Sequence, residues 1–349
     1  MALAAIIRAA NRQNKSLDLS RKDLDQCPSL IGQLTKIEEI KLTNNRLTDL
    51  PKEMCLLNKL QLLNIGGNKF AVLPINLQHF TNLRSLIAYN NRIEILPPIV
   101  LNSLKNVTLL NLNNNNLKQI PAEIGRLKNL QNFSVDHNQL EELPFELCYL
   151  ERLENLHLGY NHLISLPEDL GQLWRLKRLI LHKNCLQELP ASITNCGNLT
   201  VLDVASNELR TFPPEFETLP LKQFYYECNP LLQLRPVSSV QEEEVFALKE
   251  TVARYIMNQM KNNYPNLWHM IITNPESRTI LNEGSQCAVC KNFLLNTWLE
   301  CVKFVATPQK GFKTSSTTDL MPINARLCSY KCFNKRHNFY GIASTTEPQ

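Results

Sequence analysis

Residues 37–51, IEEIKLTNNRLTDLP, decide the fold of this chain. The pattern LxxLxLxxNxLxxLP returns from there onwards about every 23 residues, a spacing typical of stacked repeats. An apolar residue holds its first position each time, as Ile37, Leu60, Leu83, Val107, Leu130, Leu153, Leu176 and Leu199. All steps have the same length except the one from Leu83 to Val107, which is longer by a single position. A period this regular predicts one structural unit that is repeated and stacked.

The LxL part of each repeat, such as Ile40 and Leu42, alternates apolar and polar residues, as a half-buried strand does. Such strands pair in parallel with their neighbours about 4.8 Å apart. One repeat cannot bury its apolar face alone, so the stack itself forms the core. The sequence therefore predicts an α/β leucine-rich-repeat solenoid of about ten repeats, with a curved parallel sheet on the concave side and short helices or turns on the convex side.

An asparagine recurs where the chain leaves each strand, as Asn45, Asn68, Asn91, Asn115, Asn138, Asn161, Asn184, Asn207 and Asn229. Backbone groups at this turn lose their sheet partners and cannot be left unpaired. An asparagine amide donates and accepts at once, so a ladder of these residues can satisfy adjacent turns. We expect them to be structural residues and not a binding site.

The convex side is equally regular, because a proline such as Pro51 follows each pattern and suits the first turn of a short helix. Residues three and six positions later, here Met54 and Leu57, are expected to face inward. In the fourth repeat Pro98 is taken as the equivalent proline. The extra residue of that repeat is therefore expected on the convex or flanking edge.

Five parts are expected along the chain. They are a capping helix at 1–13, the repeats at 14–232, a helical cap at 233–284, a cysteine-rich module at 285–340 and a tail at 341–349. The first helix would cover the open edge of the first repeat with Leu3, Ile6, Ile7 and Ala10. Within the helical cap we expect one helix from Ser239, with Glu242 as a capping-box partner, and a second near 275–284.

No apolar run approaches the length of a membrane span, roughly 18 residues. The apolar stretch at the N-terminus lacks the basic region with which a secretory signal peptide begins. We therefore expect a cytoplasmic protein, with the nucleus as an alternative. Its eleven cysteines are then expected to be mostly free thiols. The net charge of +5 lies in the segment from Lys291 onwards. Few arginines cluster there, so a solvated basic surface is favoured over contact with nucleic acid.

Four cysteines form two close-spaced pairs, Cys287 with Cys290 and Cys328 with Cys332. Zinc prefers tetrahedral sulfur, and a reducing compartment favours a metal over a disulfide. A site with four sulfurs has no open position for water, so the zinc would be structural. A redox CxxC motif, which would need a thioredoxin-like context, and unlinked core cysteines are the alternatives. Cys301 is interpreted as a core residue.

The LxxLP repeats resemble the intracellular class of leucine-rich-repeat proteins, similar to the Ras-suppressor and Shoc-type solenoids. The segments QCAVC (286–290), TWLECVKFV (297–305) and LCSYKCF (327–333) resemble the tail of several numbered leucine-rich-repeat-containing proteins, and RYIMNQM (254–260) fits that tail too. The resemblance covers essentially the whole chain. It implies a soluble, non-enzymatic repeat protein and no secure mechanism.

The concave face is expected to bind a partner through outward strand residues and the turns after them. Aromatic residues and histidines collect in repeats six to eight, and exposed aromatic residues on a rigid scaffold are typical anchors. The candidate binding residues are Tyr89, Asn113, Asp136, His137, His157, Tyr160, His182, Lys183 and Tyr225. Apolar residues such as Leu62 and Ile87 on the same face favour a protein partner. A merely solvated face and a three-histidine metal site are the alternatives.

We therefore expect a non-enzymatic, monomeric scaffold for protein partners. No glycine-rich phosphate loop, activated nucleophile or open metal site is apparent, and no membrane span is expected. The alternative is a substrate-receptor subunit of a ubiquitin ligase or a similar complex, with the solenoid holding the client. No adaptor-docking box supports that alternative. Nucleic-acid contact through the basic C-terminal module is less favoured.

Overall fold

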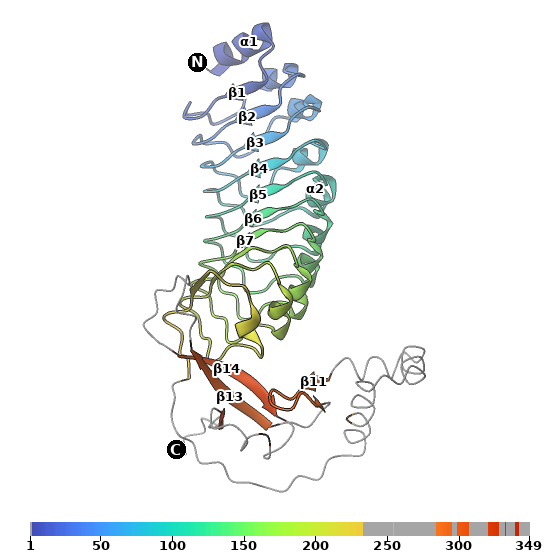
Figure 1. Cartoon of the computed structure of the whole chain (residues 1–349). Coiled ribbons are helices and arrows are strands. Elements are labelled where there is room, and N and C mark those ends of the chain that lie inside the picture. Colours follow the sequence, from blue (N-terminus) through green and yellow to red (C-terminus); the bar gives the residue numbers. More distant parts are fainter. Residues whose placement is uncertain are drawn as a thin grey trace, which may run out of the picture. The chain divides into compact units, whose positions relative to one another are not determined.

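The computed structural model describes residues 2–232, 254, 284–294, 299–306, 320–327, 332 and 339–341. Apart from Arg254 and Gly284, the two helices expected between residues 239 and 284 lie outside the described residues, as do Cys328 and the tail after Gly341. The chain divides into two compact units (Figure 1). The first is built on Met1–Leu209 and Thr218–Pro230, and the second contains Arg210–Glu217 and the chain beyond Leu231 except for residues 308–317.

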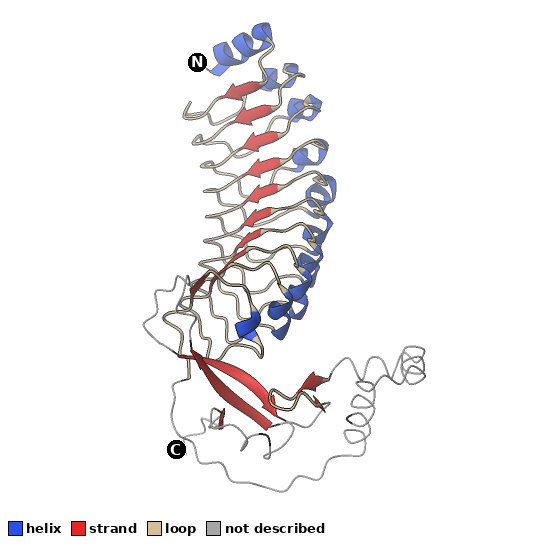
Figure 2. Cartoon of the chain, viewed as in Figure 1, coloured by secondary structure: helices blue, strands red, loops and turns tan. Residues whose placement is uncertain are grey.

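Ten strands form one parallel sheet in sequence order (Figures 1 and 2). They are β1 (Ser16–Asp18), β2 (Glu39–Lys41), β3 (Leu62–Asn64), β4 (Ser85–Ile87), β5 (Leu109–Asn111), β6 (Asn132–Ser134), β7 (Asn155–His157), β8 (Arg178–Ile180), β9 (Val201–Asp203) and β10 (Gln223–Tyr225). The middle residue of each strand is buried. Equivalent residues pair across every step, as Leu156 does with Leu179. The predicted solenoid and its sheet are confirmed.

The convex side consists mainly of short 3-10 helices that lie opposite the strands (Figure 2). They are η1 (Ser29–Gln33), η2 (Lys52–Leu56), η3 (Ile75–His79), η4 (Ala122–Arg126), η5 (Phe145–Tyr149), η6 (Glu168–Gln172), η7 (Ala191–Asn195) and η8 (Phe216–Thr218). Met54 and Leu57 are fully buried beneath η2. Because such short segments close only tight turns, such as the bond from Leu57 N to Met54 O, most of these elements are 3-10 and not α-helical.

The longer repeat between Leu83 and Val107 differs, because its convex element is an α-helix, α2 (Pro98–Ser103). Leu104 N donates to Val100 O four residues back at 3.2 Å. The extra residue is therefore absorbed on the convex side. Pro97 caps this helix with the extended backbone that Pro51 has before η2. The expected equivalence of Pro98 is wrong by one position, since Pro98 is already the first helical residue.

The asparagine ladder connects neighbouring repeats. The Nδ2 group of Asn138 donates to Val135 O in its own repeat and to Leu112 O in the previous one, at 3.0 and 3.1 Å. Its Oδ1 accepts from Leu117 N at 3.0 Å. The other eight asparagines of the ladder make the corresponding bonds. Each side chain therefore satisfies three backbone groups that the turn would otherwise leave unpaired.

Helix α1 (Ala2–Arg12) lies at the edge of the first repeat and buries Ile6 and Ala9. Leu3 and Ile7 remain about half exposed, so the expected apolar face is only partly right. The buried face follows the three-residue spacing of Ile6 and Ala9 and not the four-residue spacing of Leu3 and Ile7. No helix among the described residues is long and apolar enough to cross a membrane.

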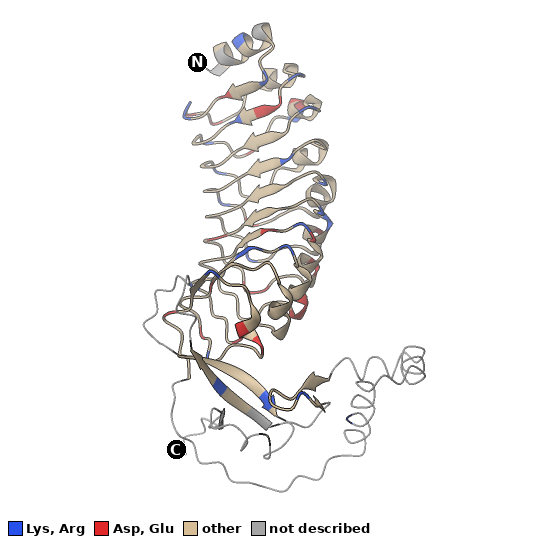
Figure 3. Ribbon diagram, in the orientation of Figure 1, with Lys and Arg blue, Asp and Glu red and all other residues tan. Residues whose placement is uncertain are grey.

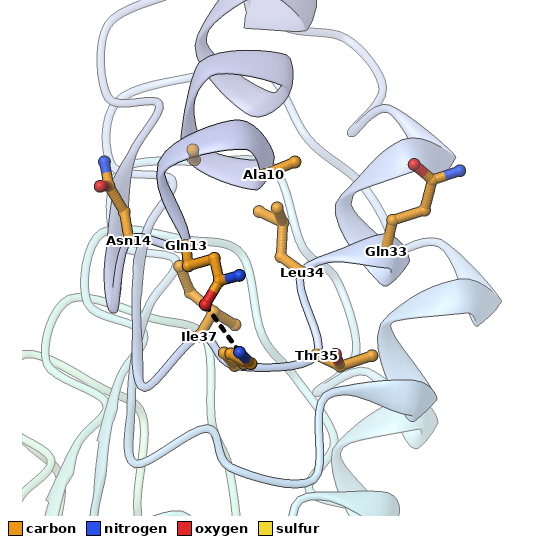
Figure 4. A pocket seen from close by; sticks show the side chains of 9 residues that line it. Ala10, Gln13, Asn14, Gln33, Leu34, Thr35 and Ile37 are labelled. Atoms are coloured by element: carbon orange, nitrogen blue, oxygen red, sulfur yellow. Dashed lines mark hydrogen bonds between the residues drawn. The ribbon is translucent and has the colours of Figure 1, made fainter.

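A pocket of about 190 Å³ opens where α1 meets the end of the first repeat (Figure 4). Ala10 and Leu34 line it, and Lys36 Nζ donates to Gln13 Oε1 across one end at 2.7 Å. This pocket belongs to the packing of the first helix against the solenoid edge.

The second unit contains two small antiparallel sheets. Strands β11 (Ser285–Gln286) and β12 (Phe293–Leu294) form a hairpin. Strand β13 (Leu299–Ala306) lies between β14 (Leu320–Leu327) and β15 (Phe339–Gly341).

Residues Arg210–Glu217 belong to this second unit although they continue the repeat pattern. Phe212 N donates to Pro322 O at 2.9 Å, and Asn324 N donates to Phe212 O at 2.8 Å. Lys303 Nζ also binds Glu217 Oε1 at 2.8 Å. These bonds explain why the compact unit begins earlier in the sequence than the expected boundary at residue 232.

Candidate functional site

The residue before each ladder asparagine has a left-handed backbone. Repeats two to five place asparagine or glycine there, as Asn44, Gly67, Asn90 and Asn114. Repeats six to eight, which carry β6 to β8, instead place His137, Tyr160 and Lys183 there, with φ of 55°, 53° and 54°. This conformation costs about 1–2 kcal/mol for an ordinary residue, whereas glycine and asparagine adopt it routinely. Repeats six to eight therefore accept a conformational cost that the preceding four avoid, and Arg21, Ser206 and Cys228 accept the same cost in repeats one, nine and ten.

These three side chains stack on one another. The His137 and Tyr160 rings are 3.9 Å apart between centroids and lie 17° from parallel. The Lys183 ammonium lies 4.5 Å from the centroid of the Tyr160 ring, and the ring of His182 meets Tyr160 edge-on at 5.1 Å. Tyr160 thus lies between side chains from the repeats on either side of its own. We call His137, Tyr160 and Lys183 the aromatic column.

Asp136 supports the surface beside the column. Its Oδ1 accepts from Gly159 N at 2.7 Å, and its Oδ2 lies 3.7 Å from His157 Nδ1. Asp136 N in turn donates to Asn113 Oδ1 at 2.8 Å. Asp136 and Asn113 therefore connect adjacent repeats and hold the backbone, which leaves them little capacity to bind a partner.

Asp203 on β9 contacts His182 as Asp136 contacts His157. Its Oδ2 lies 3.1 Å from His182 Nδ1, and its Oδ1 accepts from Ala205 N at 3.2 Å. Burial raises the pKa of Asp203 above its ordinary value, against the opposing effects of the Ala205 N–H and of His182. The carboxylate fixes the orientation of the His182 ring.

Two glycines make room for rings of the next repeat. A Cβ on Gly159 would lie 2.9 Å from the His182 ring, and a Cβ on Gly66 would lie 2.7 Å from the Tyr89 ring. The Tyr89 ring therefore lies over the third repeat, well before the column begins. Tyr225 is half-buried on β10, two strands beyond β8. The structure brings together His137, Tyr160, His182 and Lys183, with Asp136 and His157 beside them, and leaves Tyr89 and Tyr225 apart.

Three of the four predicted metal ligands come together. Cys287 and Cys290 lie on the turn between β11 and β12, where Lys291 N donates to Cys287 O at 3.0 Å. The sulfurs of Cys287, Cys290 and Cys332 all lie within 4.8 Å of one another. Tetrahedral zinc with bonds near 2.3 Å holds sulfurs roughly 3.8 Å apart, so this arrangement fits the ion. The fourth predicted ligand, Cys328, lies outside the described residues.

Cys301 and the concave histidines do not belong to this group of possible metal ligands. Burial raises the pKa of the Cys301 thiol to about 12, and its Sγ donates to Ala325 O at 3.4 Å. It is an inert core residue. Among the described residues, the three cysteines are the one group of metal-ligating side chains close enough to hold an ion, so the concave histidines form no such group.

Sequence reasoning missed a second set of exposed aromatic residues, on the convex side. Phe145 and Tyr149 on η5 are 56% and 42% exposed, and Trp174 after η6 is 49% exposed. The Phe145 and Tyr149 rings meet edge-on at 5.9 Å, and the Arg175 guanidinium lies 4.5 Å from the Trp174 ring. A sequence signal was present, because Phe145 follows Pro144 directly at an outward position of the repeat.

Comparison with known proteins bears on the fold. A family model described as leucine rich repeat matches residues 81–140 and 151–220. The repeats are leucine-rich repeats. The leucine-rich-repeat solenoid is similar to a leucine-rich-repeat protein of Leptospira interrogans, with a TM-score of 0.60, 32% identity, and coverage of 66% of this chain and 65% of that one. The functional domain of InlJ from Listeria monocytogenes, at 22% identity and a TM-score of 0.57, covers 67% of this chain and 51% of that one and shares the fold.

The chain is also similar to curated proteins named leucine-rich repeat-containing protein 69. The Xenopus laevis protein is 42% identical over 135 residues, which are 38% of this chain and 39% of that protein. The human protein is 43% identical over 124 residues, which are 35% of each chain. The mouse protein is 38% identical over 133 residues, which are 38% of each chain. The matched segment spans less than two fifths of this chain and about two fifths or less of each of these relatives.

Proposed function

We propose that the solenoid is a non-enzymatic scaffold that holds a protein partner on the concave face of repeats six to eight. The observation that carries this proposal is the aromatic column of His137, Tyr160 and Lys183. Large aromatic side chains on a rigid surface are typical binding anchors.

The surroundings of the column support a preorganised surface. Hydrogen bonds of Asn138, Asn161 and Asn184 fix the three turns from below. Asp203 orients His182, and Gly159 leaves space for its ring. A partner would therefore meet side chains that already hold their positions, which lowers the entropy cost of binding.

For the C-terminal unit we propose a structural zinc on Cys287, Cys290, Cys328 and Cys332. Support comes from the three described sulfurs and from the burial of Cys287 and Cys332. Bound zinc would supply crosslinks that tie the β11–β12 hairpin to the chain after β14. We also propose a reducing compartment, cytoplasmic or nuclear, in which thiolates remain available for metal.

A second candidate is a substrate receptor of a larger assembly such as a ubiquitin ligase. The division of the chain into two compact units favours this reading. The solenoid would hold the client and the C-terminal unit would dock to the assembly. Both candidates place a protein on the concave face, so one experiment tests their common part.

The test is affinity capture with quantitative mass spectrometry, using the full chain as bait. The concave variant carries Tyr160→Ala with His182→Ala, and the matched convex control carries Glu168→Ala with Gln172→Ala on exposed positions of η6. Loss of anchor residues should weaken binding by on the order of 2 kcal/mol or more. We expect specific partners to be lost from the concave variant alone. Partners that persist on it and disappear from the convex control would place the binding surface on the other side.

A further inference from the structure

The charge of the concave surface between β6 and β8 is uneven. Residues 132–137, 155–160 and 178–183 contain one carboxylate, two permanent cations and three histidines. Strands β3 to β6 carry no charged residue at all (Figure 3). The cations, Arg178 and Lys183, are both exposed, and neither takes part in an ion pair among the described residues. The uncompensated charge of this part of the face is therefore positive.

The carboxylates nearby are already engaged. Asp136 accepts from Gly159 N and faces His157, while Asp203 accepts from Ala205 N and faces His182. Neither carboxylate is placed to neutralise Arg178 or Lys183. A negative group from outside would supply the missing charge without displacing an internal bond.

Lys183 is held in position for such a group. Its left-handed backbone and the ring of Tyr160 beneath its ammonium restrict a side chain that would otherwise lose considerable entropy on binding. Arg178, at the first position of β8, adds a planar donor suited to carboxylates. Lys183 held against the Tyr160 ring, with Arg178 exposed at the start of the same strand, fits a peptide that carries acidic side chains.

We infer that Arg178, Lys183 and the aromatic column bind an acidic segment of a protein partner. This inference rests on the proposed function and names the chemistry of the segment. The glutamate or aspartate side chains of that segment pair with Arg178 and Lys183, while its apolar atoms contact Tyr160. Because exposed ion pairs are screened, the affinity falls as salt rises.

The test measures fluorescence polarisation of three labelled probes with the full chain. The first probe is a peptide of alternating glutamate and alanine, the second replaces glutamate by lysine, and the third is an oligothymidylate. The test variant carries Arg178→Gln with Lys183→Gln. The control carries Lys59→Gln with Lys105→Gln, which removes the same charge from exposed convex positions. The acidic peptide should bind wild type and control alike and bind the test variant about tenfold more weakly or worse.

Three outcomes would overturn the inference. The acidic peptide could fail to bind, it could bind the test variant as tightly as wild type, or the oligothymidylate could bind as tightly and depend on the same two residues. The last outcome would assign the surface to nucleic acid. If the acidic peptide fails while Tyr160→Ala with His182→Ala still abolishes partner capture, the proposed function stands and only the acidic chemistry is wrong.

Discussion

The imidazole of His137 lies flat on the phenol ring of Tyr160, with 3.9 Å between centroids and 17° between planes. Both residues have left-handed backbone at the position where Asn90 and Asn114 stand in earlier repeats. The fold sets the backbone conformation at this position, and the sequence of repeats six and seven fills it with rings. The stacking offsets part of the conformational cost.

Replacing the central ring tests this balance. Tyr160→Asn should relieve roughly 1 kcal/mol of backbone strain and lose a stacking contact worth about 0.5–1.5 kcal/mol. We expect the free energy of unfolding, measured by urea denaturation, to stay within about 0.5 kcal/mol of wild type, the difference of those two terms. Leu158→Ala is the destabilised reference, because it empties a fully buried position at a cost of about 2–5 kcal/mol. An equal loss in both variants would show that Tyr160 is a structural residue.

The asparagine ladder predicts that replacing Asn138 destabilises the fold more than replacing Asn114. Asn138→Ala leaves three backbone groups of the turn without partners and should cost on the order of 1–3 kcal/mol. Asn114 is exposed and bonds none of them, but its φ is +55°. Asn114→Ala therefore carries its own strain, and Asn114→Gly is the cleaner control. In urea melts, Asn138→Ala should have the lowest midpoint and Asn114→Gly one close to wild type. Equal urea midpoints for Asn138→Ala and Asn114→Gly would contradict the stabilising role assigned to the asparagine ladder.

Metal content tests the cysteine site. Protein purified without a tag should hold about one zinc per chain by plasma mass spectrometry, as four thiolates require. Cys287→Ser should lose the metal, because it removes a sulfur within 4.8 Å of two others. Cys301→Ser, a buried thiol outside that group, should retain it. Wild-type protein without zinc, or equal loss in both variants, would sink the zinc proposal.

The ion pair between Glu217 and Lys303 predicts a pH dependence. Burial raises the pKa of Glu217, but Lys303 at 2.8 Å, the Glu217 backbone N–H and Lys291 lower it more, so the pKa lies below its ordinary 4.5. A lowered carboxyl pKa stabilises the fold above pH 4.5, and this stabilisation is lost as pH falls through the native value. Glu217→Gln should therefore lower the urea midpoint at pH 7 and converge with wild type in acid.

Glu215 supplies the matched control for that measurement. Its bond to Lys291 is 3.4 Å long, and both side chains are more than half exposed. Exposed pairs of this kind contribute little, so Glu215→Gln should leave the midpoint unchanged at either pH. A difference between wild type and Glu217→Gln that grows in acid would show that the fold does not lower the pKa of Glu217.

Much of the fold could be predicted because the same pattern of apolar residues and asparagine recurs in every repeat from the second onwards. The alternation around Leu42 and the recurrence of Asn45 fix which residues face the core, and the strand register follows from the period. The convex elements were harder, since the proline in each repeat suits a 3-10 turn and an α-helix alike. Only the number of residues that follow decides between them, as α2 shows. The buried face of α1 was predicted only in part, because Ile6 and Ile7 are equally apolar neighbours and only Ile6 is buried.

The candidate site was only partly visible in the sequence. Letters alone show that His137, Tyr160 and Lys183 recur at one repeat position, but not that this position is left-handed. The stacking depends on that conformation and on the spacing between strands. Phe145 and Tyr149 were missed on the convex side, because the sequence reasoning there followed the inward positions three and six residues after the proline.

Site-specific photo-crosslinking reports directly which face of the solenoid contacts a partner. A benzophenone amino acid placed at Ile180, a half-buried concave residue of β8, reports contacts beside the column. The same group at Gln172 on η6 reports contacts on the convex side, near Trp174. With partners captured from cell extract, we expect a discrete adduct from position 180 that Tyr160→Ala with His182→Ala abolishes, and none from position 172. An adduct from position 172 alone would contradict it and would move the binding surface to the convex aromatic residues.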